Sequence, residues 1–355
     1  MKCMFGRSDG KKGNYAYAVA RVKAKKSTLM KEDAYAKMLM MSVPEISRFL
    51  SENGYQKEMT ELAGRIEGID LVEHATYRNM AKVFSTILSA SAGELREMLE
   101  AYLEKWDNWN LKVILRGKSY GMDVESIKED LVPAGKLTAN DLDKFLSTES
   151  YEEVLASFGR IEAISIPQEL LSNYKVSENL TDIEDHLDKM YYEKLLKSIN
   201  PSSRPTRLFQ DFVRKEIDTV NLGTILKLKT EGICGDDVMK YIIPGGKQID
   251  KKLATQLANA ESISAVATDL AQLDFYEDIK DALDGESKSL RNIVAGMKKY
   301  QIRQARTFSH LYPLSVIPIL DFMIHKEIEV SNIRIVARGI ESGVDKEVIK
   351  GLLVV

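Results

Sequence analysis

Apolar residues along most of this chain recur every three or four positions, which is the spacing of one face of an α-helix. Long runs of this kind cover residues 58–91 and 93–106, and shorter ones cover 15–26, 31–41 and 44–50. No stretch alternates apolar and polar residues with the period of two that indicates a half-buried strand. The pattern therefore predicts an all-α protein.

One helical segment occurs three times. It covers residues 107–137, begins again at Asp218, and returns in shortened form at the C-terminus. Three kinds of residue recur 111 positions apart: an asparagine (Asn110, Asn221, Asn332), a cation (Arg116, Lys227, Arg338) and a glycine (Gly121, Gly232, Gly343). In the third copy we place a one-residue deletion after Gly343, so that Val348 takes the position of Ile127 and Val238.

A fixed internal period of this length indicates a fold built from repeated units. We expect three similar helical-bundle repeats over residues 27–136, 137–247 and 248–355, with the helix at 15–26 completing the third. Equal units can stack as an open solenoid or close into a ring. Three units with a truncated last copy favour closure.

Several residues predict helix ends. Ser42 is placed to cap a helix with Pro44 in its first turn, and Thr138 with Asp141 has the spacing of a capping box. Gly121 is expected to end its helix in a left-handed conformation. The next short helix should then begin at Asp123. We expect the segment 200–205, which contains two prolines, to be a loop before a long helix from residue 206.

Composition excludes several classes of protein. The chain has 355 residues, 44% of them hydrophobic and 29% charged, with a net charge of −3, so no nucleic-acid partner is indicated. No window approaches the ~20 apolar residues that span a bilayer, and the first residues lack the apolar core of a signal peptide. The two cysteines, Cys3 and Cys234, are too few for a disulfide framework, and we expect both to be small, at least partly buried apolar side chains.

No set of residues predicts catalytic chemistry. The four histidines stand at no spacing that a zinc or catalytic site uses. Gly117-Lys118-Ser119 resembles the end of a phosphate-binding loop, but the earlier glycine of that motif is missing and the tripeptide lies in or just after a helix. We expect no catalytic, cofactor-binding or metal-binding residues and no cofactor.

The repeated cations Arg116, Lys227 and Arg338 have two interpretations. Each lies near a predicted helix C-terminus, where a positive charge is favoured by the helix dipole. Alternatively, one cation per repeat forms a surface for a negatively charged partner. Asn110, Asn221 and Asn332 are expected to bond locally to the backbone or to form a shared packing motif.

These segments carry a resemblance. The opening NYAYAVARVKAKKSTLM, the segments DNWNLKVILRGK and FVRKEIDTVNLGTILKLK, and the turn PGGK resemble the C subunit of archaeal and vacuolar-type rotary ATPases, whose eukaryotic counterpart is the d subunit. The resemblance covers essentially the whole chain. It implies a funnel of three helical domains around a pseudo-threefold axis.

The resemblance also implies a function. The protein would be a non-catalytic part of the rotor, peripheral to the membrane on its cytoplasmic face, with the central-shaft subunits and the membrane proteolipid ring as partners. It would transmit torque during ATP-driven or ATP-producing transport of protons or sodium ions. The alternatives are a helical-repeat scaffold for soluble partners, which would be elongated, and a helical enzyme with a site built from distant carboxylates and tyrosines.

Overall fold

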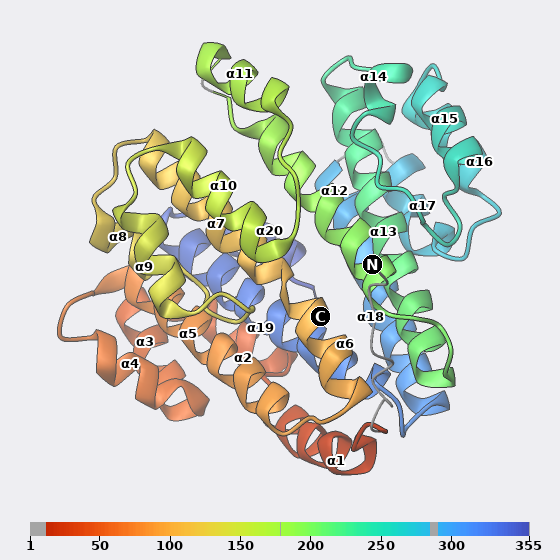
Figure 1. Cartoon of the computed structure of the whole chain (residues 1–355). Helices are drawn as coiled ribbons and strands as arrows, with labels where there is room; N and C mark the ends of the chain where they lie inside the picture. Colours follow the sequence, from red (N-terminus) through yellow and green to blue (C-terminus); the bar gives the residue numbers. More distant parts are fainter. Residues whose placement is uncertain (1–11, 178, 285–289, 355) are drawn as a thin grey trace.

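The protein is helical throughout the part that the structure describes. A computed structural model (Figure 1) describes residues 12–177, 179–284 and 290–354, and no strand occurs in these ranges. The all-α fold class is therefore confirmed. The division into repeats at residues 136/137 and 247/248 stays a prediction.

The helices vary from one turn to 27 residues, and a π-helical turn, η1, joins α3 to α4. In chain order they are α1 (Tyr15–Lys26), α2 (Glu32–Met38), α3 (Val43–Leu50), η1 (Ser51–Tyr55), α4 (Gln56–Leu62), α5 (Gly68–Ser89), α6 (Glu94–Leu103), α7 (Lys105–Ser119), α8 (Val124–Glu129), α9 (Ala139–Ser147), α10 (Tyr151–Glu162), α11 (Gln168–Ser177), α12 (Thr181–Ser198), α13 (Arg204–Thr230), α14 (Asp236–Met239), α15 (Lys251–Asn259), α16 (Ile263–Leu270), α17 (Tyr276–Asp284), α18 (Leu290–Leu311), α19 (Ile317–Glu341) and α20 (Lys346–Leu352).

The apolar side chains form one shared cluster and three outer ones. The shared cluster takes residues from α1, α5, α6, α12, α13 and α19. The outer clusters lie around the C-terminal halves of α7, α13 and α19, the helices that carry the threefold segment. The cluster at α19 joins the two ends of the chain, because residues between Tyr35 and Ala75 pack there against residues between Ile333 and Leu353. Figure 1 shows α19 beside the N-terminal helices α2 and α5, against which it packs.

The same helix ending occurs in all three copies. Gly121, Gly232 and Gly343 have positive φ angles of 66°, 80° and 64°. The N–H of the residue after each glycine donates to the carbonyl five positions earlier, and the glycine N–H donates to the carbonyl three positions earlier. This pair of bonds is the Schellman motif, so the left-handed ending predicted for Gly121 is confirmed.

Each repeated asparagine ties its helix to the chain 22 residues later. The Asn110 side chain donates to the Val132 carbonyl at 2.9 Å and accepts from the Val132 N–H at 2.7 Å. Asn221 makes the same two bonds with Ile243, and Asn332 with Val354. All three asparagines are buried, so each amide satisfies backbone groups that would otherwise be unpaired.

The predicted deletion in the third copy is wrong. Ile349, not Val348, is buried at 1% exposure and lies against Gly339, as Ile127 lies against Gly117. Val348 is 52% exposed. The spacing of 22 residues between Asn332 and Val354 also equals that in the other copies, so no residue is lost.

Local end signals predicted the helix starts well. Ser42 and Thr138 each form a capping box, and the Asp123 side chain accepts from the Ser126 N–H. The start of α13 is different from the prediction, because the helix begins at Arg204 with Ser203 as its cap. Pro205 is accommodated inside the first turn, where its missing N–H has no partner to lose.

Candidate functional site at the junction of three helices

A cavity of about 360 Å³ lies where α13, α18 and α19 meet the α6–α7 junction. Lys105 of α7, Glu216 of α13 and Glu327 of α19 all line it. These residues are 111 positions apart in the sequence, so each precedes the repeated asparagine of its own copy by five residues. Lys105, Glu216 and Glu327 therefore form a polar layer in the wall of the cavity, and each copy of the repeated segment contributes one of its residues.

Lys105 contacts both Glu327 and Tyr102. Its Nζ lies 2.6 Å from Glu327 Oε1 and 4.3 Å from the centre of the Tyr102 ring. The ammonium group is therefore held by a carboxylate and by the negative face of an aromatic ring. Burial raises the pKa of Glu327, and the charge and hydrogen bond of Lys105 act in the opposite direction.

Glu216 is held by two buried tyrosines. Its Oε2 accepts from the Tyr102 hydroxyl at 3.0 Å, and its Oε1 accepts from the Tyr192 hydroxyl at 2.8 Å. Burial raises the pKa of both tyrosines well above the ordinary value, so both hydroxyls remain donors at any physiological pH. The layer thus has fixed side chains and an excess of carboxylates over the cation Lys105.

A second set of equivalent residues lies one helical turn further along. Trp109, Val220 and Ser331 are again 111 positions apart, and all three side chains are at least partly exposed. Trp109 is 37% exposed and lies with its ring centre 6.1 Å from that of Trp106. An exposed tryptophan fixed by a neighbouring ring is typical of a protein-binding surface.

The arrangement can bind and orient, but it brings together no catalytic set. No group of three histidine, cysteine or acidic side chains that could hold a metal ion occurs among the residues described. The lining of this cavity, as far as the structure describes it, contains no histidine or cysteine. Its carboxylates and lysines, together with the exposed Trp109 one helical turn from Lys105 on α7, are suited to docking a protein segment.

The structure does not bring the repeated cations together in this cavity. Arg116 pairs with Glu184, and Arg338 pairs with Glu73, in both cases through two guanidinium nitrogens. Lys227 is exposed and forms no ion pair within the described ranges. Glu73 and Glu184 are 111 positions apart, and the next position in this series, which would pair with Lys227, is Ala295. All three cations lie in the last turn of a helix, as the dipole interpretation requires.

The tripeptide that resembles a phosphate loop has a structural role. Lys118 donates at 2.7 Å to the carbonyls of both Leu146 and Thr148 at the end of α9. Lys229 binds the end of α15 in the same way, through the carbonyls of Ala258 and Ala260. Both lysines cap the C-terminus of a neighbouring helix.

The cysteine prediction is wrong for Cys234, which is exposed near the start of α14. Cys234 lies in the turn between α13 and α14, flanked by Gly232 and Gly235 with positive φ angles, and so stands outside the packed faces of both helices. Cys3 lies outside the described residues.

Sequence reasoning missed the layer of Lys105, Glu216 and Glu327. The 111-residue register aligns these three positions, but a repeat is usually recognised by residue types that persist in all copies. Here the charge changes sign between copies. Charged residues of either sign at equivalent positions are the signal that would have found the layer.

Among the described residues, no helix is both long enough and apolar enough to cross a membrane.

Comparison with known proteins assigns the chain to a family. The family described as ATP synthase (C/AC39) subunit matches residues 18–352. The C subunit of the A-type ATP synthase of Methanococcoides burtonii is 37% identical over 350 residues, covering 98% of this chain and 96% of that protein. The corresponding proteins of Methanosarcina acetivorans and Archaeoglobus fulgidus are 37% and 35% identical, each over 98% of this chain and over 96% and 98% of their own lengths. The chain therefore belongs to the ATP synthase C/AC39 subunit family.

Proposed function

We propose that this protein is a non-catalytic coupling subunit of the rotor in an A-type ATP synthase. It lies on the cytoplasmic face of the membrane, between the central shaft and the proteolipid ring. It transmits torque between them during ATP-driven or ATP-producing transport of protons or sodium ions. The family assignment supports a place in the complex, and the observation that carries the finer proposal is the polar cavity at the junction of the three helices.

A torque-transmitting part must grip its partner without slipping. The layer of Lys105, Glu216 and Glu327 is fixed by an ion pair and by tyrosine hydroxyls, so its charges hold their positions. Polar groups at a binding surface define orientation and register more than affinity. A shaft end seated over this layer would therefore be fixed in rotation, with Trp109, one helical turn from Lys105 on α7, as an apolar anchor.

The way in which the chain closes on itself supports a rigid part rather than an open scaffold. Residues near both ends share one hydrophobic cluster around α19. An open solenoid has its first and last units far apart, each in contact with a single neighbour. A closed arrangement resists twisting better, and we propose a funnel with three similar helical units around a pseudo-threefold axis.

The three repeated cations stay candidate contacts to a partner, but they differ in whether their charge is already paired inside the protein. Arg116 and Arg338 each already have an internal carboxylate partner. Lys227 is the cation whose charge is available to a partner, so we propose Lys227 as the contact of the three.

The proposal is tested by measuring the affinity of the full chain for the purified central-shaft subunits of its own complex. W109A is expected to weaken this binding by about tenfold, which corresponds to about 1.4 kcal/mol, because exposed aromatic anchors dominate interface energies. The control is Y120A, which removes a more exposed aromatic side chain just beyond the other end of α7.

Co-purification from detergent extracts provides the complementary measurement. The wild-type chain is expected to bring both shaft and ring subunits with it. Equal shaft affinities for the wild type, W109A and Y120A would show that the shaft does not dock at this cavity. Purification with neither partner would contradict the coupling function itself.

A further inference from the structure

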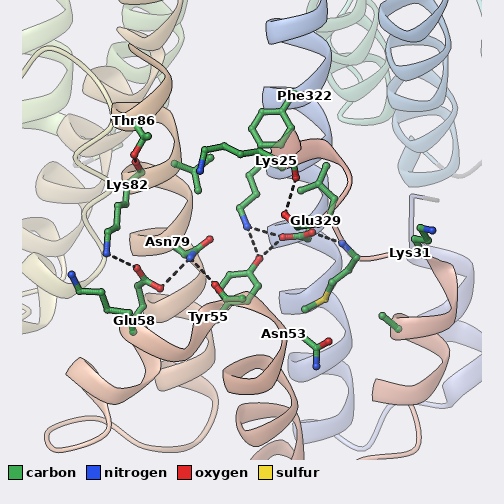
Figure 2. A pocket seen from close by; sticks show the side chains of 18 of the residues that line it. Lys25, Lys31, Asn53, Tyr55, Glu58, Asn79, Lys82, Thr86, Phe322 and Glu329 are labelled. Atoms are coloured by element: carbon green, nitrogen blue, oxygen red, sulfur yellow. Dashed lines mark hydrogen bonds and ion pairs between the residues drawn. The ribbon is translucent and has the colours of Figure 1, made fainter. Parts of the chain in front are cut away.

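A second, larger cavity lies away from the junction of the three long helices. Its volume is about 770 Å³, and its walls are the end of α1, the loop into α2, η1 and the helices α4, α5 and α19 (Figure 2). Nothing in the coupling function uses it. It lies where the N-terminal helices pack against α19.

The lining is rich in lysine. Five lysines and three carboxylates line the cavity, an excess of two positive charges: Lys25, Lys31, Lys57, Lys82 and Lys326 against Asp33, Glu58 and Glu329. The whole chain has a net charge of −3, so this concentration of positive charge is local. A concave site lined by one sign of charge attracts ligands of the opposite sign.

Lys326 forms the floor and is only 5% exposed. Its Nζ donates to the Tyr55 hydroxyl at 2.9 Å and to Glu329 Oε1 at 2.7 Å, and lies 4.4 Å from the centre of the Tyr55 ring. An ammonium group has three N–H donors. The third has no acceptor among the described residues, and Figure 2 shows the Tyr55 and Glu329 side chains meeting at this floor.

Both buried carboxylates of the lining already have hydrogen-bond partners within the protein. Glu329 Oε1 accepts from Tyr55 and Lys326, while its Oε2 accepts from the Met30 N–H at 2.6 Å. Glu58 accepts from Asn79 at 3.0 Å through one oxygen and from Lys82 at 3.2 Å through the other. Their charges are neutralised in place and do not oppose an anion.

The rim carries the free charge. Within the part of the chain that the structure describes, neither Lys25 at the end of α1 nor Lys31 before α2 forms an ion pair. These two ammonium groups equal the excess of two charges. A phosphate monoester carries nearly two negative charges at neutral pH, and lysine is a common phosphate ligand.

The size and the apolar part of the lining indicate more than a bare ion. Leu29, Val83 and Phe322 form an apolar portion of the wall. A volume of this order is in the range of sites for small organic ligands. We propose that this cavity binds a phosphate monoester attached to a small organic body, with Lys25 and Lys31 as its ligands at the rim and Lys326 at the floor.

The phosphate could belong to a soluble metabolite or to a lipid headgroup, and the test separates the two. The full chain is titrated with AMP by calorimetry, and its flotation is measured with phosphatidylcholine vesicles with and without phosphatidic acid. Binding of AMP alone identifies a soluble ligand. Binding to phosphatidic acid vesicles alone identifies a headgroup, and either result supports the site.

Variants show whether binding occurs in this cavity. K25Q/K31Q is expected to weaken binding by about tenfold or more, because it removes both unpaired charges from the rim. The matched control K23Q/K350Q removes two exposed lysines that do not line the cavity. It is expected to stay within about twofold of the wild type.

The floor is tested by K326M/E329Q, which removes the buried ammonium without leaving a charged carboxylate unpaired. It too is expected to weaken binding about tenfold. Absence of binding to both probes would overturn the proposal. Equal weakening of binding by K23Q/K350Q would also overturn the proposal, because the loss would then follow from the net charge of the protein and not from this cavity. The proposal does not depend on the shaft or the ring.

Discussion

The acidic residue three positions before each repeated asparagine has two different uses in this molecule. Asp107 accepts from the N–H groups of Lys136 and Leu137, and Asp218 accepts from those of Gln248 and Ile249. Both close a local turn about 30 residues further along the chain.

Glu329, at the third equivalent position, makes long-range contacts instead. Its carboxylate instead accepts from Met30, 299 residues away, and from Tyr55, 274 residues away. The same position in the repeat therefore closes a local turn in two copies, and in the third copy it connects parts of the chain that are far apart in sequence. The asparagine bonds, by contrast, are identical in the three copies. A repeat can therefore keep its local ties while one copy is adapted to join distant parts of the chain.

The largest expected effect comes from removing the long-range tie. E329A leaves the buried Lys326 ammonium without its carboxylate, which is expected to lower the free energy of unfolding by about 3–5 kcal/mol. Chemical denaturation monitored by helical circular dichroism measures it. K326M/E329M, which replaces the pair by apolar side chains, is expected to recover most of the loss. Equal loss in both variants would show that the ion pair itself is not what holds the ends.

A smaller effect is expected at the local tie. Gly135 packs under the Asp107 carboxylate, and a Cβ atom there would overlap the carboxylate oxygens. G135A is therefore expected to cost about 1–3 kcal/mol of unfolding free energy in the same denaturation measurement. G64A is the control, because a Cβ at Gly64 meets open space. Similar stabilities for the two variants would mean that the turn adjusts without strain.

A gradual effect, spread over several pH units, is expected in the pH dependence of stability. Burial raises the pKa of Asp107 to about 7 and that of Asp218 to about 6, although the backbone N–H donors favour the charged forms. An acid whose pKa is higher in the folded protein binds more protons when folded, so its stabilising contribution is full below about pH 4 and is lost as the pH rises to about 7.

Each such group contributes at most about 1.4 kcal/mol per pH unit to this slope. Unfolding free energies measured between pH 4 and 7 are expected to decline less steeply in D107N than in the wild type. D33N, at an exposed position, is the control. A slope unchanged in D107N would assign the pH dependence to other groups.

The features that sequence predicted best are governed by neighbours in the chain. Ser42, Thr138 and Gly121 decide helix ends through bonds to residues three to five positions away, so their type and spacing are sufficient. The register of the third copy failed for a related reason. Val348 and Ile349 are both apolar, and only packing against Gly339 shows which one is buried.

The candidate site was beyond prediction for a different reason. Lys105 and Glu327 form an ion pair between residues more than 200 positions apart, and no local spacing signals it. Tyr55 and Lys326 are 271 positions apart. Long-range contacts of this kind depend on how the units close, which the period of 111 residues leaves open.

The cluster that joins the two ends of the chain has a consequence for biosynthesis. Residues between Tyr35 and Ala75 leave the ribosome more than 250 residues ahead of their packing partners between Ile333 and Leu353. At the usual rates of synthesis, of about 5–20 residues per second, the N-terminal helices wait for some 15 seconds or more with their apolar faces uncovered. The newly made chain is therefore expected to depend on chaperones until α19 and α20 emerge.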